Sequence, residues 1–224
     1  MISDYIFICG TNTDVGKTYF GVELIKYLKR YGGCLAFKPI ETGCKKTNTD
    51  LVPHDSSKYH KILKGIIGLD QINPYRFLDP VSPYLAIKKA KKRVCLKHYK
   101  KKLTSISKNN LPIIIEGAGG AFSPFAIDGL NIDFMKLIKS KNVLVVKDEL
   151  GCIGSTLSHY FSFKKYRVKL DCIVLNNTKK NKMDNYNEIK KYVDIPVYLF
   201  GNSGANNLKC FKAIKNCLNI KIID

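Results

Sequence analysis

Short apolar runs alternate with amphipathic stretches along most of the chain. Runs rich in Val, Ile and Leu predict strands at residues 4–9, 34–38, 112–116, 142–147, 170–175 and 195–199. Helical spacing of apolar residues predicts helices near residues 17–31, 55–64, 95–108, 130–140, 154–165, 182–193 and 205–217. The strands are continuously apolar, which is typical of parallel strands covered on both faces. The pattern therefore predicts an α/β fold with a doubly wound, mostly parallel sheet flanked by helices, in a single domain over residues 1–224.

One segment, residues 39–94, departs from this alternation. It is rich in Pro, Asn and charged residues, and it is long for a simple connection. We expect it to be largely irregular apart from the helix near residues 55–64. Ligands of doubly wound sheets bind at the carboxyl ends of the strands, so candidate chemistry is expected in the residues that follow each strand.

The first strand is followed by "GTNTDVGKT", residues 10–18, which then opens a helix. Glycines in such a loop let backbone N–H groups converge on phosphate oxygens, and the helix adds the positive end of its dipole. Lys17 would reach the β- and γ-phosphates and Thr18 would hold Mg²⁺, although the glycines are one residue further apart than in the usual P-loop pattern. The alternative is a tight turn that ends in a surface lysine. We predict a P-loop NTPase-like nucleotide site that includes Thr13, Asp14, Val15, Gly16, Lys17 and Thr18.

Two further motifs, "FKPIETG" and "EGAGG", follow predicted strands. Lys38 would point into the same crevice and neutralise charge on a transferring phosphoryl group, and Thr42 is a candidate hydrogen-bond donor to substrate. Glu116 ends a strongly apolar strand, where a carboxylate suits a metal ion shared with phosphates. The alternative for Glu116 is a charged strand end before a flexible loop. The nucleotide contacts expected next to it are Gly117, Ala118 and Gly119.

The net charge of +20 is the most unusual feature of the composition. The 34 Lys and 4 Arg are scattered along the chain, whereas nucleic-acid readers rely on Arg forks and aromatic platforms. The one dense run, residues 87–102, has helical character. We interpret the charge as a lysine-rich solvated surface and expect no nucleic-acid partner. Nucleic-acid contact and the attraction of anionic substrates are the alternatives.

The cysteine pattern and the hydropathy indicate the compartment. The eight cysteines include no C-x-x-C pair, and several lie in apolar runs, so we expect buried, reduced thiols. No run of about 18 apolar residues occurs, so we expect no membrane partner. The N-terminus has an acid at Asp4 and too short an apolar run for a signal peptide. We expect a cytoplasmic protein.

The motifs "GTNTDVGKT", "KPIETG", "EGAGG" and "LGCIG", in this order, resemble those of the dethiobiotin synthetase family. That family's phosphate loop also has the longer spacing, and its N-P-Y-x-F-x-x-P-x-S-P segment is similar to "INPYRFLDPVSPYLA", residues 72–86. The resemblance runs from residue 4 to about residue 177. It implies a P-loop NTPase fold and an ATP-dependent ligase of biotin biosynthesis, with ATP as co-substrate and Mg²⁺ as cofactor.

The resemblance also implies a reaction and roles for residues. In that family, carbon dioxide adds to an amine of diaminopelargonate, the carbamate attacks the γ-phosphate of ATP, and the second amine displaces phosphate to close a ring. Lys17 and Lys38 would then be catalytic, and Thr11 and Thr42 would hydrogen-bond the substrate. Asp55, which taken alone is best explained as an N-cap, gains a second role. The implied metal ligands are Thr18, Asp55 and Glu116.

A homodimer and an adenine site are further implications of the resemblance. Asn176 and Asn177, expected after a strand, fall where the family reads the base, although an amide there is also common turn chemistry. In the homodimer, the loop of one subunit would present a helix N-terminus to the distant carboxylate of the other subunit's substrate. The residues of this loop are Gly151, Cys152, Ile153 and Gly154.

The chain departs from the family pattern in several places. The family commonly has Asn-His after "LGCI", where this chain has Gly154 and Ser155. Asp148 and Glu149 place two acids near the expected carboxylate site. The last strand leads into "LFGNSGANN" instead of a proline-bearing loop, so base selectivity does not follow from the sequence.

Related P-loop ATPases are the nearest rival interpretation. Partition and septum-positioning ATPases carry an extra Lys early in the phosphate loop, and no Lys lies between Gly10 and Gly16. Cobyrinate synthases usually have an attached glutaminase domain, for which this chain has no room. A basic DNA-binding module that uses residues 87–102 is a more distant rival, and steep salt dependence of binding would identify it. We favour the dethiobiotin synthetase interpretation.

Overall fold

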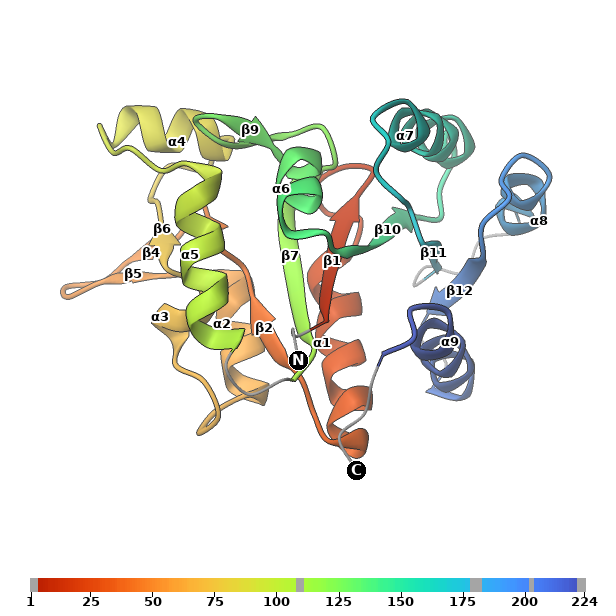
Figure 1. Cartoon of the computed structure of the whole chain (residues 1–224), viewed down its shortest axis with the longest axis horizontal. Helices are drawn as coiled ribbons and strands as arrows, with labels where there is room; N and C mark the ends of the chain where they lie inside the picture. The colour runs from red at the N-terminus through yellow and green to blue at the C-terminus, as the bar shows by residue number, and fades with distance from the viewer. Residues whose placement is uncertain (1–3, 108–110, 178–182, 202–203, 221–224) are drawn as a thin grey trace.

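A six-stranded sheet forms the core of the structure, a computed structural model that describes residues 4–107, 111–177, 183–201 and 204–220. In chain order its strands are β1 (Tyr5–Gly10), β2 (Leu35–Phe37), β7 (Ile113–Gly120), β10 (Lys141–Lys147), β11 (Cys172–Asn177) and β12 (Val197–Gly201). Their spatial order is β12-β11-β10-β1-β7-β2, and every neighbouring pair is parallel (Figure 1). All six predicted strands are present, and the predicted parallel sheet is confirmed.

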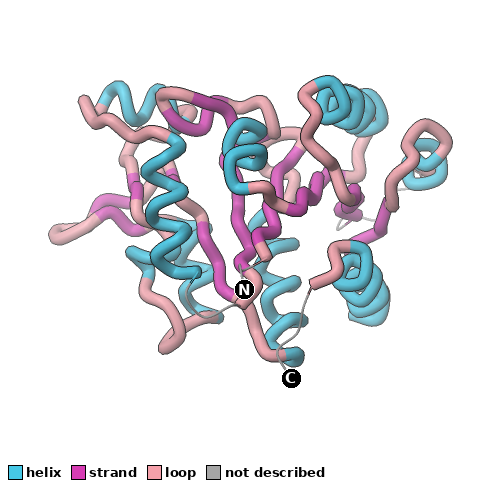
Figure 2. Tube along the Cα trace, in the orientation of Figure 1, coloured by secondary structure: helices cyan, strands magenta, loops and turns pink. Residues whose placement is uncertain are grey.

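Helices cover both faces of this sheet, so it is doubly wound as predicted. The helices are α1 (Lys17–Leu28), α2 (His54–Ile62), α3 (Leu69–Ile72), α4 (Pro83–Lys89), α5 (Leu96–Ile106), α6 (Asn131–Ile138), α7 (Cys152–Lys165), α8 (Asn185–Lys190) and α9 (Gly204–Cys217). Figures 1 and 2 show α5 and α6 in front of the sheet and α1 and α2 behind it. The predicted helix ends at residues 108 and 182 lie outside the described residues.

The segment 39–94 is more regular than the sequence suggested. Besides α2, α3 and α4 it contains two small ladders, one parallel and one antiparallel. These elements are too short to leave a periodic pattern, which is why the sequence did not reveal them. Their strands are β3 (Ile40–Glu41) with β6 (Tyr75–Arg76), and β4 (Lys45–Lys46) with β5 (Leu51–Val52).

Aromatic side chains fix the helices on the front face of the sheet. Phe7 of β1 contacts Phe125 and Phe134 edge-on, with ring centroids 6.1 and 6.3 Å apart. Tyr99 of α5 packs on the same two rings, and its hydroxyl donates a hydrogen bond to the carbonyl of Phe125 at 2.8 Å. Phe125 belongs to β8 (Pro124–Ala126), which pairs with β9 (Gly129–Leu130). This cluster holds α5 and α6 over β1, next to the strand ends that carry the site.

The lysine-rich run 87–102 is not one helix, and the prediction of helical character is wrong at its centre. α4 ends at Lys89, α5 begins at Leu96, and between them Lys91 adopts a left-handed backbone with φ 51°.

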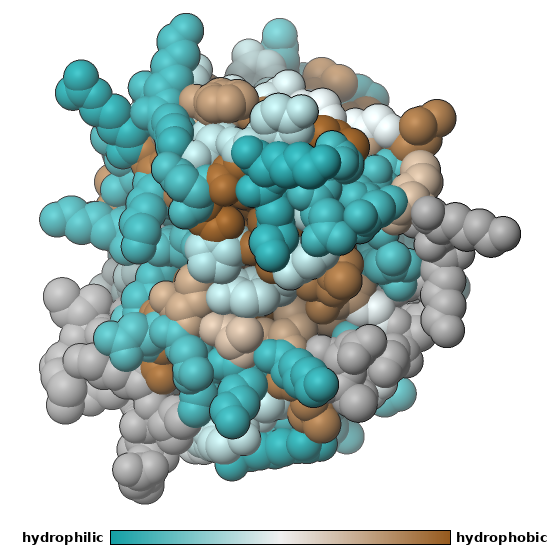
Figure 3. Space-filling view, turned by 90° about the vertical axis from the view of Figure 1, so that its right-hand side faces the viewer, coloured by the Kyte–Doolittle hydropathy of each residue, from teal (hydrophilic) through white to brown (hydrophobic). Residues whose placement is uncertain are grey.

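On the face of the molecule that carries α7, α8 and α9, Figure 3 shows many hydrophilic side chains with hydrophobic ones between them. In the part of the chain that the structure describes, no helix is long and apolar enough to cross a membrane.

All eight cysteines are free thiols, as predicted from the sequence. Seven of them are buried, and Cys217, the last residue of α9, is partly exposed. Burial raises the pKa of Cys9 and of Cys34 to about 12, so these two thiols stay protonated at neutral pH. They contribute to the core as small apolar side chains.

Candidate active site

The loop between β1 and α1 closes around its own lysine. Lys17 Nζ donates a hydrogen bond to the carbonyl of Asn12 at 2.8 Å. A Cβ on Gly10 would lie 2.8 Å from that carbonyl oxygen and 3.2 Å from Lys17 Nζ, so any larger residue would open the loop. Asp14 and Gly16 have φ of 54° and 94°, which turns successive peptide groups toward the inside of the loop. This is the backbone geometry of a phosphate-binding loop.

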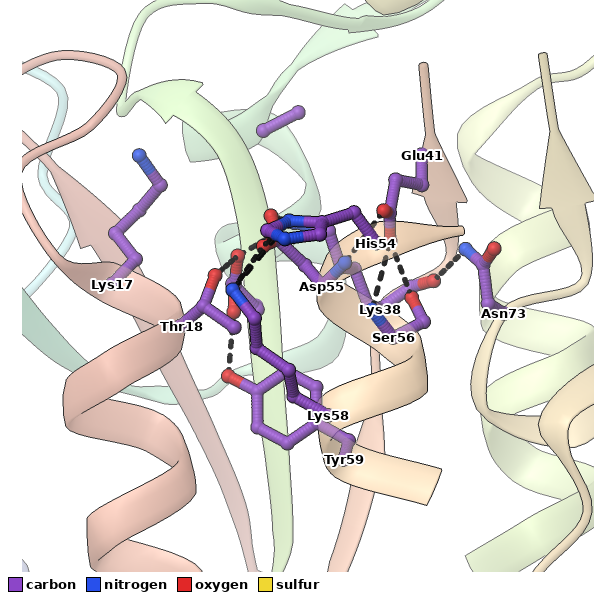
Figure 4. Close-up of polar contacts among 12 residues, drawn as sticks. Lys17, Thr18, Lys38, Glu41, His54, Asp55, Ser56, Lys58, Tyr59 and Asn73 are labelled. Atoms are coloured by element: carbon purple, nitrogen blue, oxygen red, sulfur yellow. Dashed lines mark hydrogen bonds and ion pairs between the residues drawn. The ribbon is translucent and has the colours of Figure 1, made fainter. Parts of the chain in front are cut away.

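Three donors from different elements converge on the carboxylate of Glu116, which is 1% exposed. Oε1 accepts hydrogen bonds from Thr18 Oγ1 at 2.9 Å and from Lys38 Nζ at 2.6 Å. Oε2 accepts a hydrogen bond from the hydroxyl of Tyr59 at 2.5 Å. Figure 4 shows the Thr18, Lys38 and Tyr59 side chains directed toward one another. The predicted meeting of Thr18, Lys38 and Glu116 is therefore present.

Glu116 does not end its strand, which corrects the sequence prediction. β7 continues through Gly117 to Gly120, and the pairing with β1 shifts between Ile8 opposite Glu116 and Gly10 opposite Gly120. The side chain of Asn131 holds this extension, because its Nδ2 donates hydrogen bonds to the carbonyls of Ala118 and Gly120, both at 2.8 Å. The glycine-rich residues are thus a fixed strand end and not a flexible loop.

Lys38 is set in place by the segment that contains the N-P-Y motif. Its backbone N–H donates a hydrogen bond to the carbonyl of Ile72 at 2.8 Å, and its carbonyl accepts one from Asn73 Nδ2 at 2.6 Å. Asn73 is 1% exposed. These two hydrogen bonds fix the backbone of Lys38 after β2, and its ammonium group contacts Glu116.

Asp55 lies in the first turn of α2 but is not its N-cap, so that alternative is wrong. The N-cap position is Pro53, which has no side-chain group to donate to or accept from the helix. Glu41 takes over this function: its carboxylate accepts the N–H groups of Asp55 at 2.8 Å and of Ser56 at 2.9 Å. The Asp55 side chain is left to face Lys38, with 3.7 Å between Oδ2 and Nζ.

These contacts set the charges of the site. Burial alone would lower the pKa of Lys38, but the negative charges of Glu116, Asp55 and Glu41 raise it above its ordinary value. Burial would likewise raise the pKa of Asp55, but Lys38 and Lys58 lower it. At neutral pH, Lys38 is therefore a cation and Asp55 an anion.

Lys17 and Tyr59 also have shifted pKa values. Burial lowers the pKa of Lys17, and the positive charge of Lys38 acts in the same direction. Burial and the charge of Glu116 raise the pKa of Tyr59, which stays protonated and serves as a donor.

A cleft of about 950 Å³ opens above these residues. Residues 80–83, from the proline-rich segment, form another part of its wall. Thr11, Val15, Asn176, Asn177 and the loop 151–154 are not among the lining residues. The sequence-predicted residues that line it are Thr13, Asp14, Gly16, Lys17, Thr18, Lys38, Thr42, Asp55, Glu116, Gly117, Ala118 and Gly119.

Asn176 and Asn177 are the last two residues of β11, which corrects their expected place after the strand. The ladder continues because β12 runs alongside, with Phe200 opposite Asn176 and Gly201 opposite Asn177. Asn176 Nδ2 donates a hydrogen bond to the carbonyl of Val15 at 2.9 Å, so this side chain touches the phosphate loop. The Oδ1 atoms of both residues are buried without a hydrogen-bond partner among the described residues.

The side chains of the two acids before the 151–154 loop have partners outside that loop. Asp148 is 6% exposed and accepts hydrogen bonds from Asn177 Nδ2 and Asn185 Nδ2, each at 2.7 Å. Glu149 forms an ion pair with Lys147 at 2.5 Å. Each acid has partners of its own: two neutral amides hold Asp148, and a lysine pairs with Glu149.

Sequence reasoning did not identify Glu41 and Tyr59 as parts of the site. Tyr59 follows Asp55 by four residues, so the two share one face of α2, and that spacing was a usable signal. Glu41 gave no such signal, because its position relative to α2 depends on the course of the chain between them.

The fold and the site together define a P-loop ATPase. Residues 4–199 match a family described as an AAA domain. The fold is similar to that of a ParA family ATPase from Chlorobium tepidum TLS, with a TM-score of 0.55, 11% identity and coverage of 98% of this chain and 93% of that chain. A plasmid partition protein from Borrelia burgdorferi has a TM-score of 0.55 and 15% identity, with 98% of each chain covered.

Sequence similarity identifies the family within this class. The ATP-dependent dethiobiotin synthetase BioD of Vesicomyosocius okutanii is 32% identical over 207 residues, which cover 92% of this chain and 93% of that protein. The ATP-dependent dethiobiotin synthetase BioD of Legionella pneumophila (strain Paris) is 34% identical over 152 residues, or 67% of this chain and 69% of that protein. The chain belongs to the ATP-dependent dethiobiotin synthetase family, a family of ligases.

Proposed function

We propose that this cleft forms dethiobiotin from diaminopelargonate and carbon dioxide, with conversion of ATP to ADP and phosphate. The observation that carries the proposal is the buried ammonium of Lys38, which contacts Glu116 and Asp55 and lines the same cleft as the phosphate loop. A cation fixed next to a phosphate site suits an anionic nucleophile that attacks a γ-phosphate. The names of the relatives support the choice of substrate.

The chemistry would proceed in balanced steps. An amine nitrogen of diaminopelargonate adds to carbon dioxide and loses a proton, which gives a carbamate. A carbamate oxygen attacks the γ-phosphorus of ATP, and the bond to the ADP oxygen breaks. The second amine then attacks the carbonyl carbon of this carbamic–phosphoric anhydride, loses a proton, and expels phosphate as the ring closes.

Lys38 and Lys17 would supply the charge that these steps require. Because the pKa of Lys38 is raised, it acts as a cation paired with the carbamate and the γ-phosphate, and not as a base. Lys17 would exchange the carbonyl of Asn12 for the phosphate oxygens. Thr11 and Thr42 would donate hydrogen bonds to the carbamate or accept one from an amine. No side-chain base is needed for phosphoryl transfer, since the attacking carbamate is already an anion.

Thr18, Asp55 and Glu116 would hold a Mg²⁺ ion. The three residues offer only oxygen ligands, which Mg²⁺ prefers, and the hydroxyl of Thr18 already lies 2.9 Å from Oε1 of Glu116. Asp55 and Glu116 both contact Lys38, so a bound ion would share these two carboxylates with that cation. When bound, the ion would neutralise the charge of the phosphate oxygens.

The adenine base would bind near the end of β11. The buried Oδ1 atoms of Asn176 and Asn177 have no donor among the described residues, and an exocyclic amine would supply one. The hydrogen bond from Asn176 to the carbonyl of Val15 keeps that side chain beside the phosphate loop. The base of a nucleotide whose phosphates lie in this loop would therefore be expected near Asn176.

We also infer that the active form is a cytoplasmic homodimer. Leu150 is 89% exposed immediately before Gly151, which caps the N-terminus of α7 in a left-handed conformation. In a homodimer, Gly151, Cys152, Ile153 and Gly154 would meet the substrate carboxylate of the partner, and the contact would cover the exposed Leu150. Eight free thiols suit a reducing compartment.

The test is a mass-spectrometric assay with diaminopelargonate, bicarbonate, Mg²⁺ and ATP. We expect wild-type protein to form dethiobiotin and Lys38→Ala to lose at least about 100-fold in rate. Lys61→Ala, an exposed lysine of α2, is the matched control and should retain full activity. ATP cleavage without a ring product in the wild type would overturn the substrate assignment and favour a related P-loop ATPase.

A further inference from the structure

Tyr59 is a buried side chain of α2 that the reaction scheme does not use. It is 1% exposed, and it is not among the residues that line the cleft. Its hydroxyl donates to Oε2 of Glu116 at 2.5 Å, whereas Thr18 and Lys38 both donate to Oε1. The two oxygens of Glu116 therefore have separate partners: a buried neutral donor on one, and groups of the cleft on the other.

Gly21 of α1 makes room for this hydroxyl. A Cβ at Gly21 would lie 2.2 Å from the Tyr59 oxygen and 3.1 Å from Cζ of its ring. Glycine is the least favourable residue after proline in the interior of a helix, so helix propensity does not account for its presence here. The close approach of Tyr59 does, since no larger side chain fits between α1 and the hydroxyl.

Helix α2 carries one carboxylate of the site, Asp55, and contacts the other, Glu116, through Tyr59. Asp55 and Tyr59 are one turn apart on α2 and so lie on one face of it. Asp55 Oδ2 lies 3.7 Å from Lys38 Nζ, and Tyr59 holds Glu116. Because Glu41 fixes the N-terminus of α2, the helix cannot shift without breaking these contacts.

We propose that Tyr59 is a positioning residue for the divalent-metal site, which it serves by holding Glu116 so that Oε1 remains directed at the cleft. A ligand that is fixed by an outer hydrogen bond is already oriented when the ion arrives. Because Tyr59 is a neutral donor, it adds no second positive charge to the one that Lys38 already places beside this carboxylate. The inference rests on the proposed function at one point, the assignment of Glu116 as a metal ligand.

The test compares two variants that disturb the contact from opposite sides. Tyr59→Phe removes only the hydroxyl, and Gly21→Ala displaces the ring. Tyr99→Phe is the matched control, because Tyr99 is also fully buried and its hydroxyl donates to the carbonyl of Phe125, outside the cleft. Mn²⁺ binding in the presence of ADP is titrated by electron paramagnetic resonance, and binding of ADP alone is measured by calorimetry in EDTA.

We expect Tyr59→Phe and Gly21→Ala to weaken Mn²⁺ binding about tenfold or more, because loss of an outer-shell partner typically has this effect. Binding of metal-free ADP should stay unchanged in Tyr59→Phe, and Tyr99→Phe should behave as wild type in both titrations. Unchanged Mn²⁺ affinity in Tyr59→Phe would overturn the proposal, and so would an equal loss in Tyr99→Phe, which would indicate general packing.

The two proposals fail in distinguishable ways. Wild-type protein that binds no Mn²⁺ with ADP would overturn the metal site and, with it, the positioning role of Tyr59. Neither titration contains diaminopelargonate, so a failure to form dethiobiotin would leave the result for Tyr59 intact.

Discussion

The ammonium nitrogen of Lys38 lies 2.6 Å from Oε1 of Glu116, and both side chains are buried. Neither charge has enough contact with water to be stable without the other. The pair joins the residues after β2 to the middle of β7, two neighbouring strands of the sheet. The group that we assign to catalysis therefore also contributes to the stability of the sheet at this point.

This relationship predicts that loss of one partner is worse than loss of both. Lys38→Met leaves Glu116 buried without its cation and should lower the free energy of unfolding by about 3–5 kcal/mol. Lys38→Met combined with Glu116→Gln should recover most of this loss, because no isolated charge then remains. Urea unfolding of wild type, Lys38→Met, Glu116→Gln and the double variant measures the effect. A double variant that shows the full sum of the two single losses would contradict this account of the pair.

Gly16 gives a prediction about the phosphate loop. It has φ 94°, and a Cβ there would lie 2.0 Å from Nδ2 of Asn176. Gly16→Ala should therefore cost about 1–2 kcal/mol in backbone strain, displace Asn176, and weaken ATP binding in calorimetry by at least about tenfold. Gly68→Ala is the control, since its backbone is extended and its Cβ would meet its nearest neighbour at 3.5 Å. Equal ATP affinity in wild type and Gly16→Ala would show that the loop does not need this conformation.

The sequence predicted those parts of the site that depend on local order along the chain. The phosphate loop and Lys38 follow strands that their apolar runs identify, and Glu116 comes at the end of the apolar run of β7. Parallel pairing of these strands brings the three together. The sheet was predictable for the same reason, since strands buried on both faces are continuously apolar.

The missed features depend on packing between distant segments. Glu41 reaches the N-terminus of α2 only through the fold of residues 41–55. Asn176 and Asn177 belong to β11 because β12 runs beside them, and a strand end carries no sign of how far its neighbour extends. The role of Tyr59 requires the gap at Gly21, which appears only when α1 and α2 are packed.

Cys217 should be the most reactive thiol of the protein. A hydrogen bond from Cys172 favours its thiolate and lowers the pKa of Cys217 to about 6. A thiol with a lowered pKa becomes a thiolate as pH rises through that value, so its alkylation by iodoacetamide should rise between about pH 5 and 7, well below the range of an ordinary thiol. Peptide mass spectrometry after brief labelling measures this.

The control for Cys217 is the set of seven buried cysteines, which should stay unlabelled in the folded protein. Cys217→Ser should remove the early labelling and leave dethiobiotin formation unchanged, because the residue ends α9 and does not line the cleft. Labelling of Cys217 that rises only near pH 9 would contradict the lowered pKa.

A substitution at Leu150 tests the proposed homodimer. It is 89% exposed next to the loop 151–154, and an interface that includes it would remove its apolar side chain from water. Leu150→Asp should shift the protein from dimer to monomer in light scattering and abolish dethiobiotin formation, while ATP still binds, because the phosphate loop lies within one subunit. Ile66→Asp, at a 54% exposed position after α2, should remain dimeric and active. A wild-type protein that is monomeric and fully active would contradict the dimer, and the substrate carboxylate would then have to be held by residues of its own subunit.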